Sequence, residues 1–527
     1  MSQTAKVLGK LGKTLSHQQL QKTRWDVIIV GAGHNGLTCG AYLASAGKKV
    51  LILEAKDRVG GACTLEEISP GVRVSPCAYV MGLFHDKIIK ELKLKERGLT
   101  WFPATGGMFV PFPDGDHLQL WNDGERCEAE IKRVAPKDVS GWRAMGQLIA
   151  KVRDAIRPDS DEDLWLDPRP TRQKIEDRLK HIPHGQDLLF HWSMSEFLEH
   201  FTESEKLHMA YYGQGVIGTN ASPTAKGTAS IYFHHASGRT EGMPGTWGFV
   251  KGGMGMVSFL LCDAARELGV TINCETPVNT ILPGEGVKLT DGTLIKAPTI
   301  ISNADPQVTL RLLANAADSR WKQQVEEIPT QGPTVKVNLS MSELPNFRAC
   351  PGVDEPHHKG QANTPLTKKQ WNRSFQMASE GEIPESVWNE IYFHTAYDPS
   401  VTDGDTHTVS VFSQYFPYKF KQGSWEENRP KVQKKILDTL SQYCSNIDSA
   451  TLMTQTLGPP DIESQMGLTG GHIFQGECLP NWMWEKRLTS ETPMTGVYLC
   501  GAGTHPGGSV MGVNGRNAAM VVLENNS

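Results

Sequence analysis

The chain has 527 residues, a formal net charge of −5 and a pI near 6.4. This length suffices for a large core and two interleaved domains, and the weak negative charge offers no basic field to attract nucleic acid, so we expect no nucleic-acid partner. Ten scattered cysteines without a CxxC pair or metal-ligand spacing are typical of reduced thiols in a cytoplasmic protein. No apolar run approaches the roughly 20 residues of a membrane span, and we find no secretory signal.

A stretch near the N-terminus predicts a strand–helix–strand unit that binds a dinucleotide. Val27 to Val30 is an apolar run typical of a buried parallel strand, and the glycine-rich segment Gly31 to Gly36 follows it. The small residues from Leu37 to Ala46 continue as a helix, and a second strand, Lys49 to Leu53, ends on Glu54. Strand, glycine loop, helix and terminal acid together form the complete dinucleotide fingerprint.

Each element of this fingerprint has a physical role. Gly31 allows the tight turn, Gly33 lets the backbone approach a pyrophosphate, and Gly36 lets helix and strand pack closely. The helix N-terminus presents unpaired N–H groups to the phosphates. Glu54 can accept hydrogen bonds from a ribose. The fingerprint alone does not distinguish FAD from NAD.

Two further stretches indicate FAD. Directly after Glu54, the glycines of the segment from Asp57 to Gly61 allow a second backbone pass beside the cofactor, and Arg58 can meet a phosphate. At the other end of the chain, Val497 to Gly515 again reads as a strand, a glycine-rich loop and the start of a helix. Such a return fits a cofactor too long for one strand–helix–strand unit.

These motifs carry a family resemblance. DRVGG at residues 57–61 resembles the flavin amine oxidase and phytoene desaturase superfamily, and GAGTHPGG with MGVNGRNAA resembles its carotenoid desaturase and ketolase branch. The resemblance implies an α/β fold with a Rossmann-like FAD-binding domain interleaved with an α+β substrate domain and a helical cap. One departure is Ala62, which replaces a second arginine of the amine oxidase motif. The predicted cofactor-binding residues are Gly31, Gly33, His34, Asn35, Gly36, Glu54, Ala55, Arg58, Gly60, Gly61, Ala62, Val278, Gly501, Ala502, Gly503, Gly512, Val513 and Asn514.

The domain organisation follows the composition of the chain. Residues 1–24 form a basic N-terminal arm, which we interpret as a segment docked on the body or on a second subunit, with a membrane-surface helix or an organelle presequence as alternatives. Residues 25–95, 238–306 and 490–527 are predicted to form the FAD-binding domain. Residues 96–237 and 307–489 are predicted to form the substrate domain, with a helical cap in 128–220. A homo-oligomer and a peripheral membrane contact remain open.

Several chemistries are excluded by what the sequence lacks. There is no second nucleotide fingerprint and no redox dithiol, both of which a pyridine-nucleotide disulfide reductase needs. The pairs His234-His235 and His357-His358 are expected on strands, where neighbours point to opposite faces, so we predict no metal site. FAD is then the sole redox centre, and the protein supplies position and a dry pocket.

The substrate is less tightly constrained. The resemblance implies an apolar polyene or isoprenoid that gives hydride to the flavin, with oxygen or a quinone as acceptor. One alternative is a flavin amine oxidase, whose usual pair of aromatic rings beside the flavin cannot be located from the sequence; Trp482 and Trp484 are the residues to check. The other is a flavoprotein with mainly a protein-interaction role. The segment from Glu477 to Glu485 is expected to line the substrate space. No catalytic residue is assigned, and the weak candidates are His505, Lys251 and Trp247. Cys63 follows the Gly-Gly pair and is interpreted as a buried, inert thiol.

Overall fold

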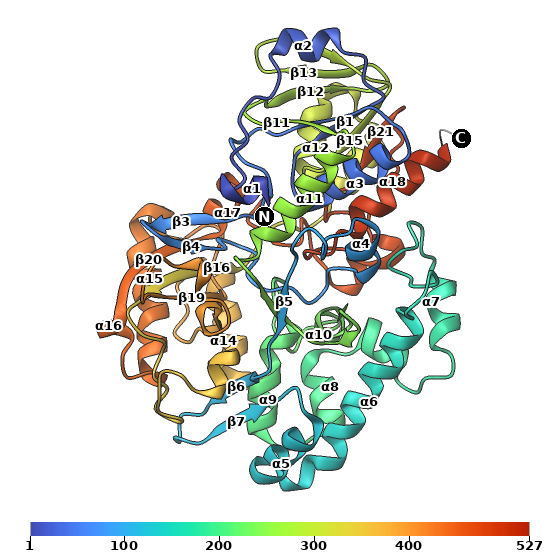
Figure 1. Cartoon of the computed structure of the whole chain (residues 1–527). Coiled ribbons are helices and arrows are strands. Elements are labelled where there is room, and N and C mark those ends of the chain that lie inside the picture. The colour runs from blue at the N-terminus through green and yellow to red at the C-terminus, as the bar shows by residue number, and fades with distance from the viewer. Residues whose placement is uncertain (1, 526–527) are drawn as a thin grey trace.

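A five-stranded parallel sheet forms the centre of the upper body in Figure 1, in a computed structural model that describes residues 2–525. Its strand order is β11-β2-β1-β15-β21, and every neighbouring pair is parallel. Strands from three distant parts of the sequence therefore meet in one sheet. Their bounds are β1 Val27–Val30, β2 Val50–Leu53, β11 Thr271–Asn273, β15 Thr299–Ser302 and β21 Val497–Leu499.

Alternate residues of these strands enter two different cores. Ile29 and Ile52 pack with helices α3 (His34–Ser45), α11 (Gly255–Glu267) and α18 (Val513–Asn525) on one face. Ile28 and Leu51 pack on the other face with the antiparallel strands β12 (Val278–Leu282), β13 (Gly286–Leu289) and β14 (Leu294–Lys296) and with α13 (Ser319–Glu326). Burial on both faces explains why the strands read as uninterrupted apolar runs.

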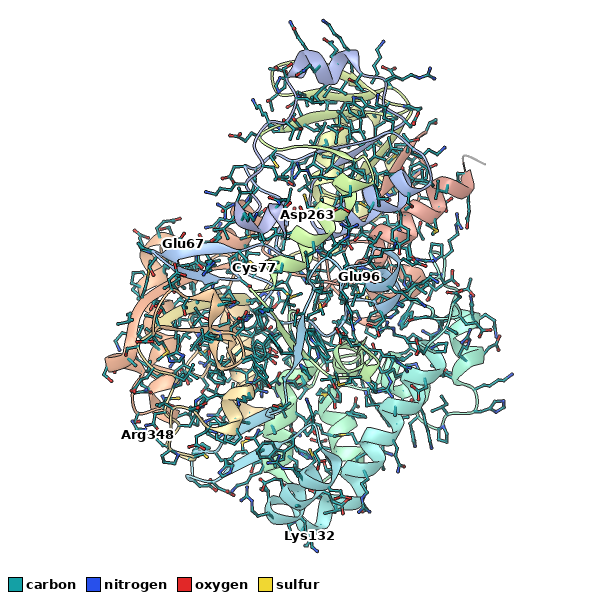
Figure 2. The ribbon with its side chains drawn as sticks, in the orientation of Figure 1. Glu67, Cys77, Glu96, Lys132, Asp263 and Arg348 are labelled. Carbon is teal, nitrogen blue, oxygen red and sulfur yellow. The ribbon has the colours of Figure 1, made fainter. Side chains whose placement is uncertain are left out.

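The basic N-terminal arm lies along this body. Ser2 and Thr4, at the start of α1 (Gln3–Lys6), donate hydroxyl hydrogen bonds to the carboxylate of Asp263 on α11, both at 2.6 Å. Figure 2 labels Asp263 at this junction. Farther along, Thr14 donates to the side chain of Asn273, and α2 (His17–Lys22) packs beside β14. The arm is thus docked on its own chain.

A second, seven-stranded sheet lies at the lower left of Figure 1. Its order is β20-β16-β19-β18-β17-β6-β7, antiparallel except where β17 pairs with β6. Strands β6 and β7 form an antiparallel hairpin whose turn contains Pro113 to Gly115. The bounds are β6 Gly107–Pro111, β7 His117–Leu120, β16 Thr334–Met341, β17 Gly360–Asn363, β18 Trp388–Phe393, β19 His407–Gln414 and β20 Thr451–Leu457.

One face of this sheet carries the second large core. Val337, Ile391 and Val411 point into it from three neighbouring strands, and they pack with Val432 and Ile436 of α15 (Trp425–Tyr443). The residues between them point the opposite way, toward the interior of the molecule. The smaller helices and hairpins around this sheet are β3 Glu66–Ser69, β4 Val72–Val74, α14 Lys368–Ser379, α16 Ile447–Ala450 and α17 Pro459–Met466.

The helical cap occupies the lower right of Figure 1. Its helices are α5 Gly124–Val134, α6 Val139–Ile156, α7 Arg172–Leu179, α8 Met194–Phe201, α9 Glu205–Tyr211 and α10 Ala229–Ala236. The adjacent His234 and His235 lie in α10, so the expectation that they occupy a strand was wrong. His357 and His358 lie in a short 3-10 turn, Pro356–Lys359. Among residues 2–525, no helix combines the length and apolarity needed to cross a bilayer.

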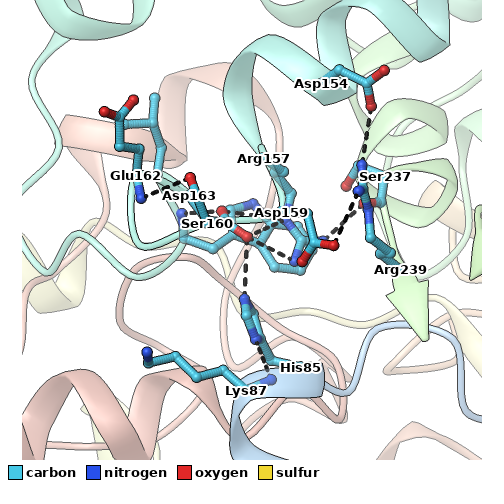
Figure 3. Close-up of polar contacts among 12 residues, drawn as sticks. His85, Lys87, Asp154, Arg157, Asp159, Ser160, Glu162, Asp163, Ser237 and Arg239 are labelled. Carbon is cyan, nitrogen blue, oxygen red and sulfur yellow. Dashed lines mark hydrogen bonds and ion pairs between the residues drawn. The ribbon is translucent and has the colours of Figure 1, made fainter. Parts of the chain in front are cut away.

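A buried ion pair within the cap lies where the cap meets the rest of the molecule. Arg157, just after α6, pairs with Asp163 at 3.2 Å, and both side chains are 5% exposed. Asp163 also contacts His85 Nε2 at 3.2 Å, and Arg157 donates to the carbonyl oxygen of Ser237 at 2.9 Å (Figure 3). Burial would raise the pKa of the Asp163 carboxyl, but Arg157 and His85 outweigh it and hold that pKa below its usual value. The His85 contact joins the cap to the N-terminus of α4 (Asp86–Glu91), and the Ser237 contact joins the loop after α6 to the C-terminus of α10.

Candidate functional site

One elongated cavity of about 920 Å³ runs between the parallel sheet and the seven-stranded sheet. Its wall takes residues from the glycine loop after β1, from the loop after β2, from the seven-stranded sheet and from the cap. Cys77, which lines it, is labelled near the middle of Figure 2, where the upper and lower parts of the molecule meet. The cavity is therefore placed to hold a long ligand across both parts.

The glycine loop provides the first part of the wall. Gly31 has φ of +101°, which makes the tight turn after β1, and Gly33 is the N-cap of α3 without a capping side chain. Gly31, Gly33, His34 and Asn35 line the cavity. Gly36 lies behind the wall, where a Cβ would come within 2.3 Å of the carbonyl oxygen of Gly31. The N-terminus of α3 thus faces the cavity with free backbone N–H groups.

Two polar atoms beside this loop are buried without a protein partner. They are His34 Nε2 and Asn35 Oδ1. Burial lowers the pKa of His34 to about 4, so its ring is neutral and offers one donor and one acceptor nitrogen. Because buried polar atoms are nearly always hydrogen-bonded, these two fit a ligand rich in polar groups.

Glu54 marks the next part of the wall. Its carboxylate accepts backbone hydrogen bonds from Ala32 at 2.8 Å and Lys56 at 2.9 Å, and burial raises the pKa of the carboxyl above its usual value. Both hydrogen bonds hold the Glu54 carboxylate beside the glycine loop. The neighbouring Ala55 and Val278 also line the cavity, so the position suits contact with a sugar and its base.

The segment after Glu54 passes beside the glycine loop, as its glycines predict. Gly60 donates its N–H to the carbonyl oxygen of Ala32 at 2.9 Å and pairs in a parallel bridge with Gly33. Arg58, Gly60, Gly61 and Ala62 line the cavity. The Arg58 guanidinium donates to Asp57 at 3.2 Å and to the carbonyl oxygen of Leu65 at 3.1 Å, which holds it at the cavity edge.

The C-terminal loop reaches the cavity through fewer residues than predicted. Ala502 lines the wall, together with Ser509 and Val510, which the sequence did not single out. Asn514 donates to the carbonyl oxygen of Thr504 at 3.0 Å and so pins the loop from behind. The predicted residues that lie behind the wall and not in it are Gly501, Gly503, Gly512, Val513 and Asn514, and their cofactor contacts stay a prediction.

The weak catalytic candidates fall in three different environments. Trp247 lines the cavity, with its indole N–H donated to the carbonyl oxygen of His235 at 3.2 Å. His505 is buried outside the wall, contacts the carbonyl oxygen of Leu164 at 2.8 Å, and burial lowers its pKa to about 4. Lys251 is exposed and away from the cavity. Only Trp247 is therefore placed to touch a ligand there.

Two further expectations concern Cys63 and the segment after Glu477. Cys63 is buried outside the wall, and burial raises the pKa of its thiol to about 11, which matches an inert thiol. The segment from Glu477 to Glu485, including Trp482 and Trp484, contributes no residue to the wall, so its expected place in the substrate space was wrong. The reason is that Glu477 turns away to Thr219, whose hydroxyl donates to it at 2.6 Å.

The sequence missed the floor of the cavity. Lys336, Phe412 and Glu390 stand in register on the neighbouring strands β16, β19 and β18, and all three line the cavity. Gln361, opposite Tyr392, leads on to Met108 and Leu120, which face each other on β6 and β7. All of these residues line the cavity. The face of the sheet opposite the core is thus a floor that runs from polar to apolar.

Two ionisable groups in this floor are almost fully buried. Lys336 is 2% exposed, and burial lowers its pKa to about 7. Its Nζ donates to Asn338 Oδ1 at 2.7 Å and lies 4.6 Å from the ring centre of Tyr79. Glu390 is 3% exposed, and burial raises its pKa to about 7. The sequence did contain a signal for these two residues. Each is a charged residue within a largely apolar strand, next to residues that point into the core, so its own side chain must point to the opposite face. No group of three or more metal-ligating side chains occurs in the part of the chain that the structure describes.

Comparison with known proteins decides the family. Residues 36–381 match the family described as flavin containing amine oxidoreductase. The chain belongs to this family. It is 30% identical over 545 residues to the mouse protein named pyridine nucleotide-disulfide oxidoreductase domain-containing protein 2, covering 95% of this chain and 94% of that one. It is 26% identical to the lycopene-forming phytoene desaturase of Pantoea ananas, covering 94% and 98%.

A solved structure supports the fold. Cyclohexylamine oxidase from Brevibacterium oxydans superposes with a TM-score of 0.56 at 17% identity, covering 96% of this chain and 100% of that one. The predicted α/β flavoprotein fold is confirmed. This flavin-containing amine oxidoreductase is an FAD-dependent oxidoreductase. The phosphate-facing N-terminus of α3, the unpartnered atoms of His34 and Asn35 and the Glu54 carboxylate fit FAD, whose flavin supplies the redox chemistry when bound.

Proposed function

We propose that this enzyme oxidises an elongated, largely apolar substrate such as a polyene or isoprenoid, with oxygen or a quinone as the final acceptor. The observation that carries the proposal is the cavity floor. From β16 to β7 it crosses five inter-strand spacings of about 4.8 Å, or roughly 24 Å. A compact substrate would not need a floor of this length.

The far end of the cavity supports an apolar chain. Met108 and Leu120 form the floor there, and Ile217, Tyr211 and Tyr232 of the cap region line the same cavity. Apolar surface buried against such a wall contributes about 25 cal/mol per Å². The name of the Pantoea ananas relative, a phytoene desaturase, supports a substrate of this class.

Lys336 and Glu390 are two residues of the wall whose pKa suits proton exchange near neutral pH, and we choose Lys336 as the base. Its pKa of about 7 means that a large share of the side chains is neutral at that pH, with a free electron pair on Nζ. Asn338 fixes the position of Nζ from one side, and the Tyr79 ring lies on another. We assign Lys336 to proton exchange with the substrate and the cap residues to the exclusion of water.

An amine is the second candidate substrate. A specific observation favours it: Glu390 is a buried carboxylate in the cavity wall, with aromatic rings of Tyr79 and Tyr392 close by. Carboxylates and aromatic faces both attract ammonium groups. Cyclohexylamine oxidase, which shares the fold, bears an amine in its name.

The test is an anaerobic screen of the purified yellow protein. Carotenoids, isoprenoids and amines are added separately, and bleaching of the flavin absorption is followed. Bleaching by polyenes or isoprenoids supports the proposal, and bleaching by amines alone replaces it with the second candidate. If no compound in any panel bleaches or perturbs the flavin, the alternative of a flavoprotein with mainly a protein-interaction role is favoured.

A further inference from the structure

The Glu390 carboxylate is held in the cavity by hydrogen bonds with three neutral side chains, Tyr79, Gln214 and Tyr392. The Tyr79 hydroxyl donates to Oε2 at 3.2 Å, and the Gln214 amide donates to Oε1 at 3.3 Å. No ion pair joins Glu390 to a Lys, Arg or His anywhere in residues 2–525. The carboxylate is therefore buried with hydrogen bonds but without a compensating positive charge.

Such a group is costly to keep. A buried carboxylate without a charged partner loses its hydration and regains only part of that free energy from neutral donors. The pKa of about 7 for Glu390 expresses this cost. A carboxylate oxygen accepts more than one hydrogen bond, so Glu390 retains acceptor capacity toward the cavity that it lines.

Its surroundings define what can approach. Tyr79 and Tyr392 have ring centres 5.0 Å apart, and Phe412 lies 6.4 Å from Tyr79 and directly opposite Glu390 in the sheet. Beyond Gln361 the floor becomes apolar at Met108 and Leu120. The cavity thus offers a hydrogen-bond acceptor, Glu390, surrounded by aromatic rings, and an apolar floor that leads away from it. This combination suits an amphipathic ligand.

We propose that Glu390 anchors the polar end of the substrate, a hydrogen-bond-donating hydroxyl or protonated amine attached to an apolar chain that lies toward Met108 and Leu120. This inference rests on the proposed function and narrows it, because a pure hydrocarbon would leave the carboxylate without a ligand. Tyr79 and Gln214 donate to different oxygens of the carboxylate, so it stays in place when the Tyr79 hydroxyl is removed.

The experiment titrates the FAD-loaded protein anaerobically with three probes of the same isoprenoid chain. One probe ends in a hydroxyl, one in an amine and one in a methyl group, and the dissociation constant is obtained from the perturbation of the flavin spectrum. We expect the hydroxyl or the amine probe to bind about tenfold tighter than the methyl probe, because a hydrogen bond to a charged group contributes about 1.5–3 kcal/mol. Which of the two binds tighter identifies the head group.

Three variants separate anchoring from a merely structural role. Glu390→Gln should bring the three constants together while leaving the methyl probe unchanged, and Glu96→Gln, at an exposed carboxylate outside the cavity (Figure 2), should change nothing. Tyr79→Phe should keep the preference for donor-ended probes, because the carboxylate remains. If Glu390 only joined Tyr79 to the sheet, Glu390→Gln and Tyr79→Phe would have the same effect on the preference.

The outcomes distinguish failure of the anchor from failure of the proposed function. Equal affinity for all three probes in the unmodified protein, or a preference that survives Glu390→Gln, overturns the anchor but leaves oxidation of apolar substrates intact. If Glu390→Gln does not fold, loss of the preference in Tyr79→Phe likewise overturns the anchor. Failure of every probe to perturb or bleach the flavin overturns the proposed function itself and the anchor with it.

Discussion

The two ends of the cavity wall are built by opposite means. Around the parallel sheet, the wall is mostly backbone and small residues from one continuous motif, Gly31 to Ala62. Around the seven-stranded sheet, it is made of single large side chains, such as Lys336, Glu390 and Leu120, which lie far apart in the sequence. The end that fits the cofactor is built by local geometry, whereas the end that we propose for the substrate is built by residues that only the tertiary fold brings together.

The largest effect is expected from blocking the cofactor end. Gly33→Val places a side chain at a position where even a Cβ comes within 2.8 Å of Asn303 Nδ2 and where the wall faces the cavity. The variant should fold but purify without yellow colour, measured as the ratio of flavin to protein absorption. Gly146→Ala, at a helical glycine with open space around it, should remain fully loaded. A yellow Gly33→Val protein would show that the glycine loop is not where the cofactor binds.

The next effect concerns the joint between cap and body. Asp163→Asn leaves the buried Arg157 without its charged partner, and removing one member of a buried pair typically costs about 3–5 kcal/mol. The melting temperature should fall markedly. Asp161→Asn removes an exposed partner of Lys87 in the same loop and should change it little. Equal effects of the two substitutions would show that the buried pair and its contact with His85 contribute no special stability.

A smaller, pH-dependent effect is expected at the substrate end. Burial lowers the pKa of Lys336 from 10.5 to about 7 in the folded protein. Between these two values the unfolded chain binds more protons, so this group makes the free energy of unfolding rise with pH there, and its full cost applies below pH 7. Lys336→Met should remove that rise and stabilise the protein at pH 7, with FAD still bound. Parallel profiles of melting temperature against pH for both proteins would contradict a buried, neutral amine.

The smallest effect is expected at Lys251. Its side chain is exposed and contributes nothing to the cavity wall, although the sequence placed it near Trp247 as a weak candidate. Lys251→Ala should leave flavin content and the anaerobic bleaching rate unchanged. A slower rate would mean that this lysine reaches the substrate, and the distinction between wall and surface would have to be redrawn.

The contrast between the two ends of the cavity explains which wall residues could be predicted from the sequence. The glycine loop, Glu54 and Arg58 could be predicted because their functions depend on spacing within one short segment. Glu390 and Lys336 could not be paired from sequence, because their contact with one cavity depends on strand register across β19. The segment after Glu477 misled the prediction because closeness in sequence to the C-terminal strand does not reveal which way Glu477 turns.

The alternation along β18 has a consequence for how such enzymes diversify. Glu390 and Tyr392 face the cavity, whereas Ile391 and Phe393 face the core against α15. Deleting one residue inside this strand would exchange the two sets and bury the carboxylate in the core while exposing isoleucine to the ligand. Evolution can therefore retune specificity by replacing every second residue or by lengthening the connecting loops, but the residue count within the strands themselves is locked.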